Sequence, residues 1–271
     1  MNKCYIYNLA MIVTNKCNLD CSHCLRGTKD DNCMSDKVIE ATLDQVAAAG
    51  NIAICGGEPT LSIDRIEKII SYAIEKHIIV KNFTITINGT TYSKQLLELL
   101  DEINRYMGND AINAFFEISL DKYHLDEITK LGIKKEFYEN LKRYQESKYF
   151  LGYRDINQKL FREGNAENMD KNLTIPLRPM KKFITYVGKN GKFDRENGLC
   201  NIGPLITINP NGIITECDAS IEHQETLYNY GNIVNSSIEE IVLDKGELIL
   251  KPKKFDREVN KALNKYLTYN R

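Results

Sequence analysis

Three cysteines lie close together near the N-terminus and could jointly hold a metal. Cys17, Cys21 and Cys24 follow the spacing Cys-x3-Cys-x2-Cys. Thiolates are soft ligands that suit zinc or an iron–sulfur cluster. A closed zinc site needs four ligands; His23 completes such a set on paper, but it lies between two of the cysteines, which disfavours the geometry. An iron–sulfur cube held by three thiolates leaves one iron open to a substrate or cofactor, so the missing fourth ligand is itself a clue to function.

The composition predicts the cellular compartment of the protein and the partners that its charge favours. The 271 residues contain eight cysteines, no signal segment and no apolar run of the roughly 18 residues that cross a membrane, which favours a cytoplasmic protein. The 36 basic and 37 acidic residues leave a net charge of -1, so the chain as a whole has no pull toward nucleic acid or an anionic membrane. The length predicts one large domain, or a large domain with a small companion.

Alternating strands and helices are predicted from residue 5 to about residue 150, at the spacing of strand–helix–strand units. The predicted strands, apolar and rich in β-branched or aromatic residues, are residues 5–13, 52–55, 83–87 and 115–120. Helices are predicted behind Ser35, Ser62 and Ser93, which suit the N-cap position, and the first of them extends to Val46. The pattern predicts a parallel sheet with right-handed crossovers and helices on one side.

The second half of the chain has a weaker pattern and ends in a clearer unit. Its predicted elements are a helix at residues 137–147, strands at 173–178 and 183–187, a turn at 189–191, and a hairpin of strands 205–209 and 213–216 joined by Pro210-Asn211-Gly212. These elements divide the chain into a first domain of residues 1–195 and a C-terminal module of residues 196–271.

Glycines and polar residues follow the ends of the predicted parallel strands. They are Gly56-Gly57-Glu58-Pro59 after the second strand, Asn88-Gly89 after the third, and Ser119 and Asp121 at the fourth. The cysteine cluster follows the first strand. Because the carboxyl ends of parallel strands meet at one edge of the sheet, where such folds bind ligands, we expect these residues to lie together.

This combination resembles the radical S-adenosylmethionine (radical SAM) superfamily, whose CxxxCxxC signature follows the first strand and whose GGEP motif follows the second. The resemblance implies an α/β fold, a partial (β/α)6 TIM-like barrel with a small C-terminal α+β extension. It implies that Cys17, Cys21 and Cys24 bind a 4Fe-4S cluster whose open iron binds S-adenosyl-L-methionine. The reduced cluster would cleave this cofactor to a 5'-deoxyadenosyl radical, which abstracts hydrogen from a peptide or small-molecule substrate.

The resemblance also implies partners and an enzyme class. A radical SAM oxidoreductase needs an external one-electron donor of the flavodoxin or ferredoxin type. Because the chain begins close to the first strand, we expect no N-terminal peptide-recognition domain in it, which argues against a leader-dependent peptide enzyme, although a separate partner could supply such a domain. The alternative is a non-catalytic iron–sulfur sensor or assembly protein, and the intact Gly56-Gly57-Glu58-Pro59 motif argues against it because a cluster carrier needs no methionine site.

Cofactor-binding roles follow for the motif after the second strand and for the loop histidine. Gly56 and Gly57 would let the backbone approach the methionyl part closely. Glu58 would help to hold the ammonium group through a charge-assisted hydrogen bond. His23 stands where the family usually has an aromatic residue near the adenine, and a histidine can stack there.

Further candidates come from the third and fourth strands. Asn88, Ser119 and Asp121 are placed by the resemblance at the ribose hydroxyls or the carboxylate of the cofactor. For Ser119, ordinary hydrogen bonding at the end of a strand is the alternative. His124 is a candidate proton carrier, or a residue that only begins a helix.

The cysteines of the C-terminal module leave several alternatives open. Cys200 and the Gly212-x4-Cys217 pattern are similar to the start of the SPASM extension, and residues 230–233 and 237–241 are similar to its end. The long cysteine series expected between these two parts is missing, so the resemblance is to a truncated extension. Two thiols cannot by themselves hold a cluster that takes four. They pack as small hydrophobes, form a disulfide, or join an auxiliary cluster with other cysteines. Alternatively Cys217 is catalytic and donates a hydrogen atom to a substrate radical, as a cysteine is thought to do in family peptide epimerases.

Overall fold

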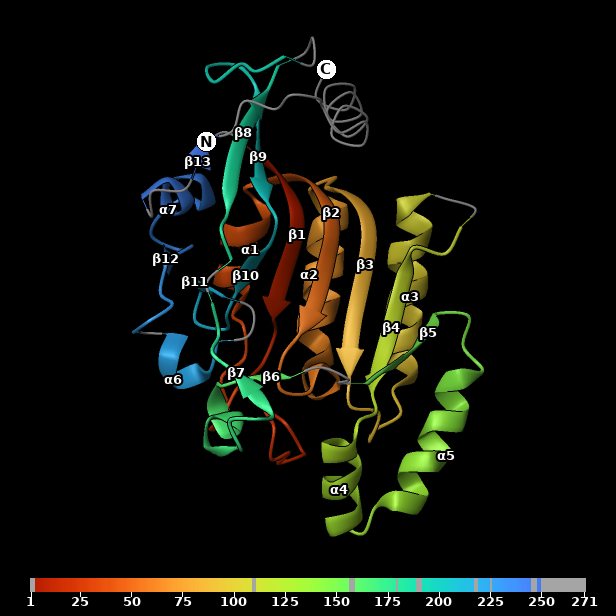
Figure 1. Ribbon diagram of the computed structural model, residues 1–271. Helices are drawn as coiled ribbons and strands as arrows, with labels where there is room; N and C mark the ends of the chain where they lie inside the picture. The colour runs from red at the N-terminus through yellow and green to blue at the C-terminus, as the bar shows by residue number, and fades with distance from the viewer. Residues whose placement is uncertain are drawn as a thin grey trace.

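The computed structural model describes residues 3–108, 111–155, 159–178, 180–188, 192–216, 219–224, 226–244 and 248–249 (Figure 1). Cys217 and the turn predicted at residues 189–191 lie outside these ranges, so the hydrogen-donor role of Cys217 stays a prediction. No helix among the described residues is long and apolar enough to cross a membrane.

Strands and helices alternate through the first half of the chain. Their bounds are β1 Cys4–Ile12, α1 Asp36–Leu43, β2 Val46–Cys55, α2 Ile63–Glu75, β3 Ile79–Ile87, α3 Lys94–Met107, β4 Ala114–Ser119, α4 Lys122–Lys130, α5 Lys134–Gln145 and β5 Phe150–Arg154. A short 3-10 helix, η1 (Pro59–Ser62), precedes α2. The four predicted strands and the helices behind them are therefore confirmed.

The second half contributes short elements. They are β6 Leu160–Phe161, the 3-10 helix η2 Gly164–Asn168, β7 Thr174–Ile175, β8 Phe183–Val187, β9 Leu199–Gly203, β10 Ile206–Ile208, β11 Ile213–Thr215, α6 Ile221–Gln224, β12 Gly231–Asn232, α7 Ile238–Asp244 and β13 Leu248–Ile249. Strands β10 and β11 form the predicted hairpin. The strand predicted at 173–178 shrinks to the two residues of β7.

One mostly parallel sheet organises both halves. Its main path runs β12-β11-β10-β1-β2-β3-β4-β5, and β1 to β5 pair in parallel. Strands β9 and β10 both pair in parallel with β1, β9 with its beginning and β10 with its end. The sheet therefore crosses the predicted boundary at residue 195, and the division into two domains stays a prediction, as does the partial barrel.

The helices α1, α2 and α3 cover one face of this sheet (Figure 1). The strand residues on that face are apolar and at most 1% exposed; they include Leu9, Met11, Ile52, Ile54, Phe83, Ile85, Phe116 and Ile118. Burial of a side chain of this size stabilises the fold by roughly 1.5–3 kcal/mol. The core thus fixes the strands whose ends carry the predicted site.

Some local predictions differ from the structure. Ser35 and Ser93 cap α1 and α3 through their side chains, but Ser62 makes no such bond at α2. Glu58 instead caps η1, so the chain turns before the helix begins. Val46, predicted at the end of a helix, begins β2 because α1 stops at Leu43 and the alanine-rich run that follows is buried in the sheet.

Candidate functional site

The cysteine loop leaves β1 and at first continues its pairing with β2. Val13 N–H donates to the Cys55 carbonyl at 2.9 Å, Gly57 N–H to the Thr14 carbonyl at 2.8 Å, and Glu58 N–H to the Lys16 carbonyl at 2.6 Å. The loop backbone is therefore hydrogen-bonded to the Gly-Gly-Glu motif up to the residue before the first cysteine.

This pairing explains the two glycines. A Cβ at Gly57 would lie 2.1 Å from the Lys16 carbonyl oxygen, and one at Gly56 would lie 2.7 Å from that of Thr14. Both contacts are with backbone, which cannot rotate away as a side chain can. The sequence predicted that these glycines make room for a cofactor; in the structure they first make room for the cysteine loop itself.

The end of β3 holds the first cysteine. Asn88 is 5% exposed, and its amide nitrogen donates to Asn18 Oδ1 at 2.8 Å and to Cys17 Sγ at 3.9 Å. Its backbone N–H donates to Glu58 Oε2 at 2.6 Å. The Leu19 N–H also donates to Cys17 Sγ, at 3.5 Å. Two N–H groups therefore point at the sulfur of Cys17, an arrangement that stabilises a thiolate there.

A distant segment holds the other two cysteines. Asn165, in η2, donates its backbone N–H to the Cys24 carbonyl at 2.9 Å and its side-chain amide to the Cys21 carbonyl at 3.0 Å. The neighbouring Glu163 is 3% exposed and accepts hydrogen bonds from Ser220 N–H at 3.0 Å and from the His223 ring at 2.9 Å. The cysteine loop is thus attached to two segments from the second half of the chain.

Residues 219–222 make direct contact with the end of this loop. The Arg26 guanidinium donates to the Ala219 carbonyl at 3.1 Å, and Ile221 N–H donates to the Arg26 carbonyl at 3.0 Å. Thr28 N–H donates to Glu222 Oε1 at 3.2 Å. The structure near the predicted cluster therefore depends on residues almost 200 positions away, which no local motif indicated.

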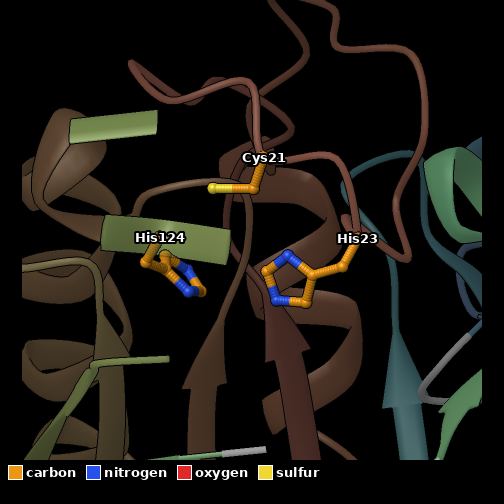
Figure 2. Close-up of side chains that lie close together, drawn as sticks. All are labelled: Cys21, His23 and His124. Atoms are coloured by element: carbon orange, nitrogen blue, oxygen red, sulfur yellow. The ribbon is translucent and has the colours of Figure 1, made fainter. Parts of the chain in front are cut away.

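Two histidines and a carboxylate lie beside Cys21, as Figure 2 shows for Cys21, His23 and His124. A ligand-type atom of each of these three residues lies within 4.8 Å of the others. Asp121 Oδ2 is 2.8 Å from His124 Nδ1 and 3.3 Å from His23 Nε2. The His23 ring stacks on Tyr123 with centroids 4.6 Å apart. His23 Nδ1 is buried and has no hydrogen-bond partner among the described residues.

Asp121 is held in this cluster as a carboxylate. Its Oδ1 accepts the N–H groups of Tyr123 and His124 and so caps α4. Burial alone would raise its pKa, but hydrogen bonds from His124 and His23 hold the pKa well below its usual range. The predicted cofactor residues His23 and Asp121 are therefore bonded to each other.

Two of the triad thiols, those of Cys17 and Cys21, in contrast have raised pKa values. Burial raises the pKa of Cys17 to about 11, against the opposing effect of the Leu19 N–H. Burial, together with the nearby Cys17 and Cys24 groups, raises the pKa of Cys21 to about 12. These thiols are protonated at neutral pH, so a metal that binds them must displace protons.

A cavity of about 260 Å³ collects most of the predicted residues. It is lined by the three triad cysteines and by His23, Gly56, Gly57, Asn88, Ser119 and Asp121. The ends of β2, β3 and β4 therefore meet the cysteine loop, as the strand pattern predicted.

Glu58 is not part of this lining. Its side chain is 1% exposed, and Oε1 accepts the N–H and hydroxyl of Thr60 while Oε2 accepts the Asn88 N–H. The role of its carboxylate in binding an ammonium group stays a prediction; in the structure the carboxylate joins the GGEP turn to the end of β3.

The cavity also contains basic residues that the sequence did not single out. Arg154, the last residue of β5, is the register partner of Ser119, and Arg26 follows the triad by two positions. The missed signal was β5 itself, five residues that follow α5 at the spacing of the earlier units. Arg154 gives the cavity a cationic group beside a hydroxyl, which suits a carboxylate or phosphate.

Comparison with known proteins finds a matching family model and several relatives. The family model described as "Radical SAM superfamily" matches residues 11–152. GTP 3',8-cyclase of Pasteurella multocida is 27% identical over 200 residues, 69% of this chain and 55% of that protein. Fe-coproporphyrin III synthase of Methanosarcina barkeri is 33% identical over 102 residues, 35% of this chain and 25% of that protein. The chain thus spans about half or less of the length of these curated relatives.

Among solved structures, the chain resembles "Native anSMEcpe with bound AdoMet and Cp18Cys peptide". The TM-score is 0.46 at 14% sequence identity, with 88% of this chain and 80% of that chain covered.

Proposed function

The chain belongs to the radical SAM superfamily, whose members use a 4Fe-4S cluster and S-adenosylmethionine, and on that premise we propose that it is an enzyme that abstracts hydrogen from a peptide or small-molecule substrate. The observation that carries the proposal is the single cavity shared by Cys17, Cys21, Cys24 and the ends of β2, β3 and β4. A protein that only carried a cluster would not need this additional polar lining.

The residues present fit the cluster and the cofactor. Three thiols face one cavity, and N–H groups of Asn88 and Leu19 point at one of the sulfurs. The buried His23 Nδ1 lacks a partner among the described residues, as expected of an atom placed for a ligand. When bound, the cluster and S-adenosylmethionine supply the one-electron chemistry that removes a hydrogen atom from a substrate.

The protein's part is to bind, orient and exclude water. We assign the cofactor carboxylate to Arg154 and Ser119, which are neighbours at the ends of β5 and β4. His23, fixed by Asp121 and stacked on Tyr123, would form a wall of the adenosine site. Glu58 and Asn88 hold the two strand ends at a constant distance through their 2.6 Å hydrogen bond.

The face of the sheet away from the helices offers a place for the substrate. Asn8, Asn51 and Asn82 are register partners across β1, β2 and β3, and all three are at least partly exposed. Asn51 shares hydrogen bonds with Thr84 on the next strand. A polar, uncharged surface of this kind suits a substrate rich in amide or hydroxyl groups.

Finer features belong to the same proposal. We propose that the sheet is a partial (β/α)6 barrel, that residues 196–271 are a truncated SPASM-like module, and that Cys217 remains a candidate hydrogen-atom donor. The enzyme would be a cytoplasmic oxidoreductase that takes electrons from a flavodoxin or ferredoxin. The near-neutral net charge of -1 supports a function without nucleic acid or membrane.

The test is reductive cleavage of S-adenosylmethionine by anaerobically reconstituted protein. With dithionite as the reductant, the wild type should form 5'-deoxyadenosine, and a Cys17→Ala, Cys21→Ala, Cys24→Ala triple variant should form none. Cys33→Ser is the matched control, because Cys33 lies outside the cavity and serine keeps a hydroxyl beside Thr14 and Ser62. A fully loaded protein that neither cleaves nor binds S-adenosylmethionine would refute the proposal.

A further inference from the structure

A second cluster of metal-ligating side chains lies at the opposite end of β1. Cys4 is the first residue of β1, whereas the triad loop follows the last residue, Ile12. Eight residue steps of about 3.3 Å separate the two ends by about 26 Å. The group of residues around Cys4 is therefore a site separate from the triad.

The pairing of the strands brings two cysteines together. Cys4 on β1 is the register partner of Cys200 on β9, and Cys200 is in turn the partner of Tyr186 on β8. Register partners on adjacent strands point to the same face of a sheet, so these three side chains lie in one row. Cys4 is 1% exposed and Cys200 is 0% exposed.

Helix α7 adds a carboxylate to this row. Figure 1 places α7 beside β8, and Glu239 lies in its first turn. One carboxylate oxygen of Glu239 and the sulfurs of Cys4 and Cys200 all lie within 4.8 Å of one another. The Tyr186 hydroxyl donates to Glu239 Oε1 at 2.7 Å and so fixes the carboxylate.

The cluster lacks a positive partner in the part of the chain that the structure describes. No lysine, arginine or histidine there forms an ion pair with Glu239. Glu239 is only partly buried and its carboxylate accepts the Tyr186 hydroxyl, so what needs an explanation is the gathering of two fully buried thiols and a carboxylate, all metal-ligating groups, at one place. A thiophilic divalent cation would compensate the carboxylate and replace the two thiol protons.

From this geometry we propose that Cys4, Cys200 and Glu239 bind a Zn²⁺ ion. Zinc–sulfur bonds of about 2.3 Å in a tetrahedral site place two sulfurs about 3.8 Å apart. The sulfurs of Cys4 and Cys200 now lie within 4.8 Å of each other, so side-chain rotations that bring them closer by at most about 1 Å would form the site. Both thiols lose their protons on binding. A water molecule, admitted past the partly exposed Glu239, supplies the fourth ligand. The ion would tie β1, β9 and α7 together, which makes it a structural centre.

The test measures zinc in the full chain with the triad cysteines replaced by alanine, so that the triad thiols cannot take up the metal. After dialysis against micromolar Zn²⁺ and removal of loosely held metal, this protein should retain about one zinc per chain. Adding Cys200→Ser should abolish retention, and adding Cys33→Ser should not. Co²⁺ in place of zinc should give a thiolate-to-cobalt absorption band that Cys200→Ser removes.

A more conservative variant is needed because Cys200→Ser replaces a fully buried side chain and could disturb the fold. Glu239→Gln keeps the volume of the side chain and should weaken zinc binding at least about tenfold, since even residues that only support a ligand typically contribute that much. Reconstituted wild-type protein should contain the same zinc in addition to its iron. Failure to retain zinc, or zinc that persists in the Cys200→Ser protein, would overturn the proposal. So would the loss of two titratable thiols in zinc-free wild type, which would reveal a Cys4–Cys200 disulfide.

Discussion

Replacement of Gly57 by alanine should separate the cysteine loop from the motif that holds it. The new Cβ would lie 2.1 Å from the Lys16 carbonyl oxygen and 2.7 Å from that of Asn15, so the loop backbone must move by about 1 Å to reach ordinary contact. Such overpacking costs about 1–3 kcal/mol. The movement also strains the hydrogen bonds from Gly57 to Thr14 and from Glu58 to Lys16, each worth about 0.5–1.5 kcal/mol.

The Gly57→Ala variant should therefore lose about 2–6 kcal/mol of unfolding free energy, measured by denaturant unfolding of the metal-free protein. It should also bind less than half of the wild-type iron after reconstitution. Gly132→Ala is the control, because a Cβ there meets nothing within 4 Å and the cost is only that of a positive φ, about 1 kcal/mol. The reasoning is refuted if Gly57→Ala keeps both full stability and full iron content.

Three further outcomes are expected. Asn165→Ala removes the side-chain hydrogen bond to the Cys21 carbonyl and should speed the loss of iron to a chelator several-fold. The control Asn172→Ala, on an exposed turn, should not change this rate. Equal rates in the two variants would contradict the role of η2 in holding the cysteine loop. Because burial raises the pKa of Cys21 to about 12, iron binding must displace its proton, and the iron affinity of the metal-free protein should rise between pH 6 and pH 9. A competition titration against a chelator measures this affinity, and an affinity that does not change with pH would contradict a buried neutral thiol. Lys182 and Glu216 form a buried ion pair of 2.7 Å. Lys182→Met would leave the Glu216 carboxylate buried without its cation, so it should lower the unfolding free energy by about 3–5 kcal/mol, measured by denaturant titration. A loss below about 1 kcal/mol would mean that the pair is not buried in solution.

The sequence predicted the part of the site that is built from local signals. The cysteine spacing and the residues at the ends of β2, β3 and β4 could be predicted because each apolar strand run stops at a clear position in the sequence. The carboxyl ends of parallel strands also lie at one edge of the sheet, so residues that follow them meet there. Arg154 was missed because β5 is short and largely exposed, so its pattern does not resemble that of the buried strands before it.

Other parts of the site depend on contacts that no sequence pattern encodes. Asn165 and Glu163 lie in an irregular segment about 140 residues from the triad, where periodicity carries no information. The motif residue Glu58 was recognised, but the direction of its carboxylate follows from the packing of Thr60 and Asn88 around it. The pairing of Cys4 with Cys200 required the register of β1 with β9, which is a property of the folded sheet.

The attachment of the cysteine loop to residues 219–222 has a consequence for biosynthesis. At about 5–20 residues per second, a ribosome that has completed Cys24 needs roughly 10–40 s more to complete Glu222. During that interval the three thiols are on a chain that lacks the Asn165, Ala219 and Glu222 contacts of the finished loop. Cluster insertion should therefore follow synthesis of residues 219–222, and delivery of iron and sulfide has to be timed to a chain that already contains them.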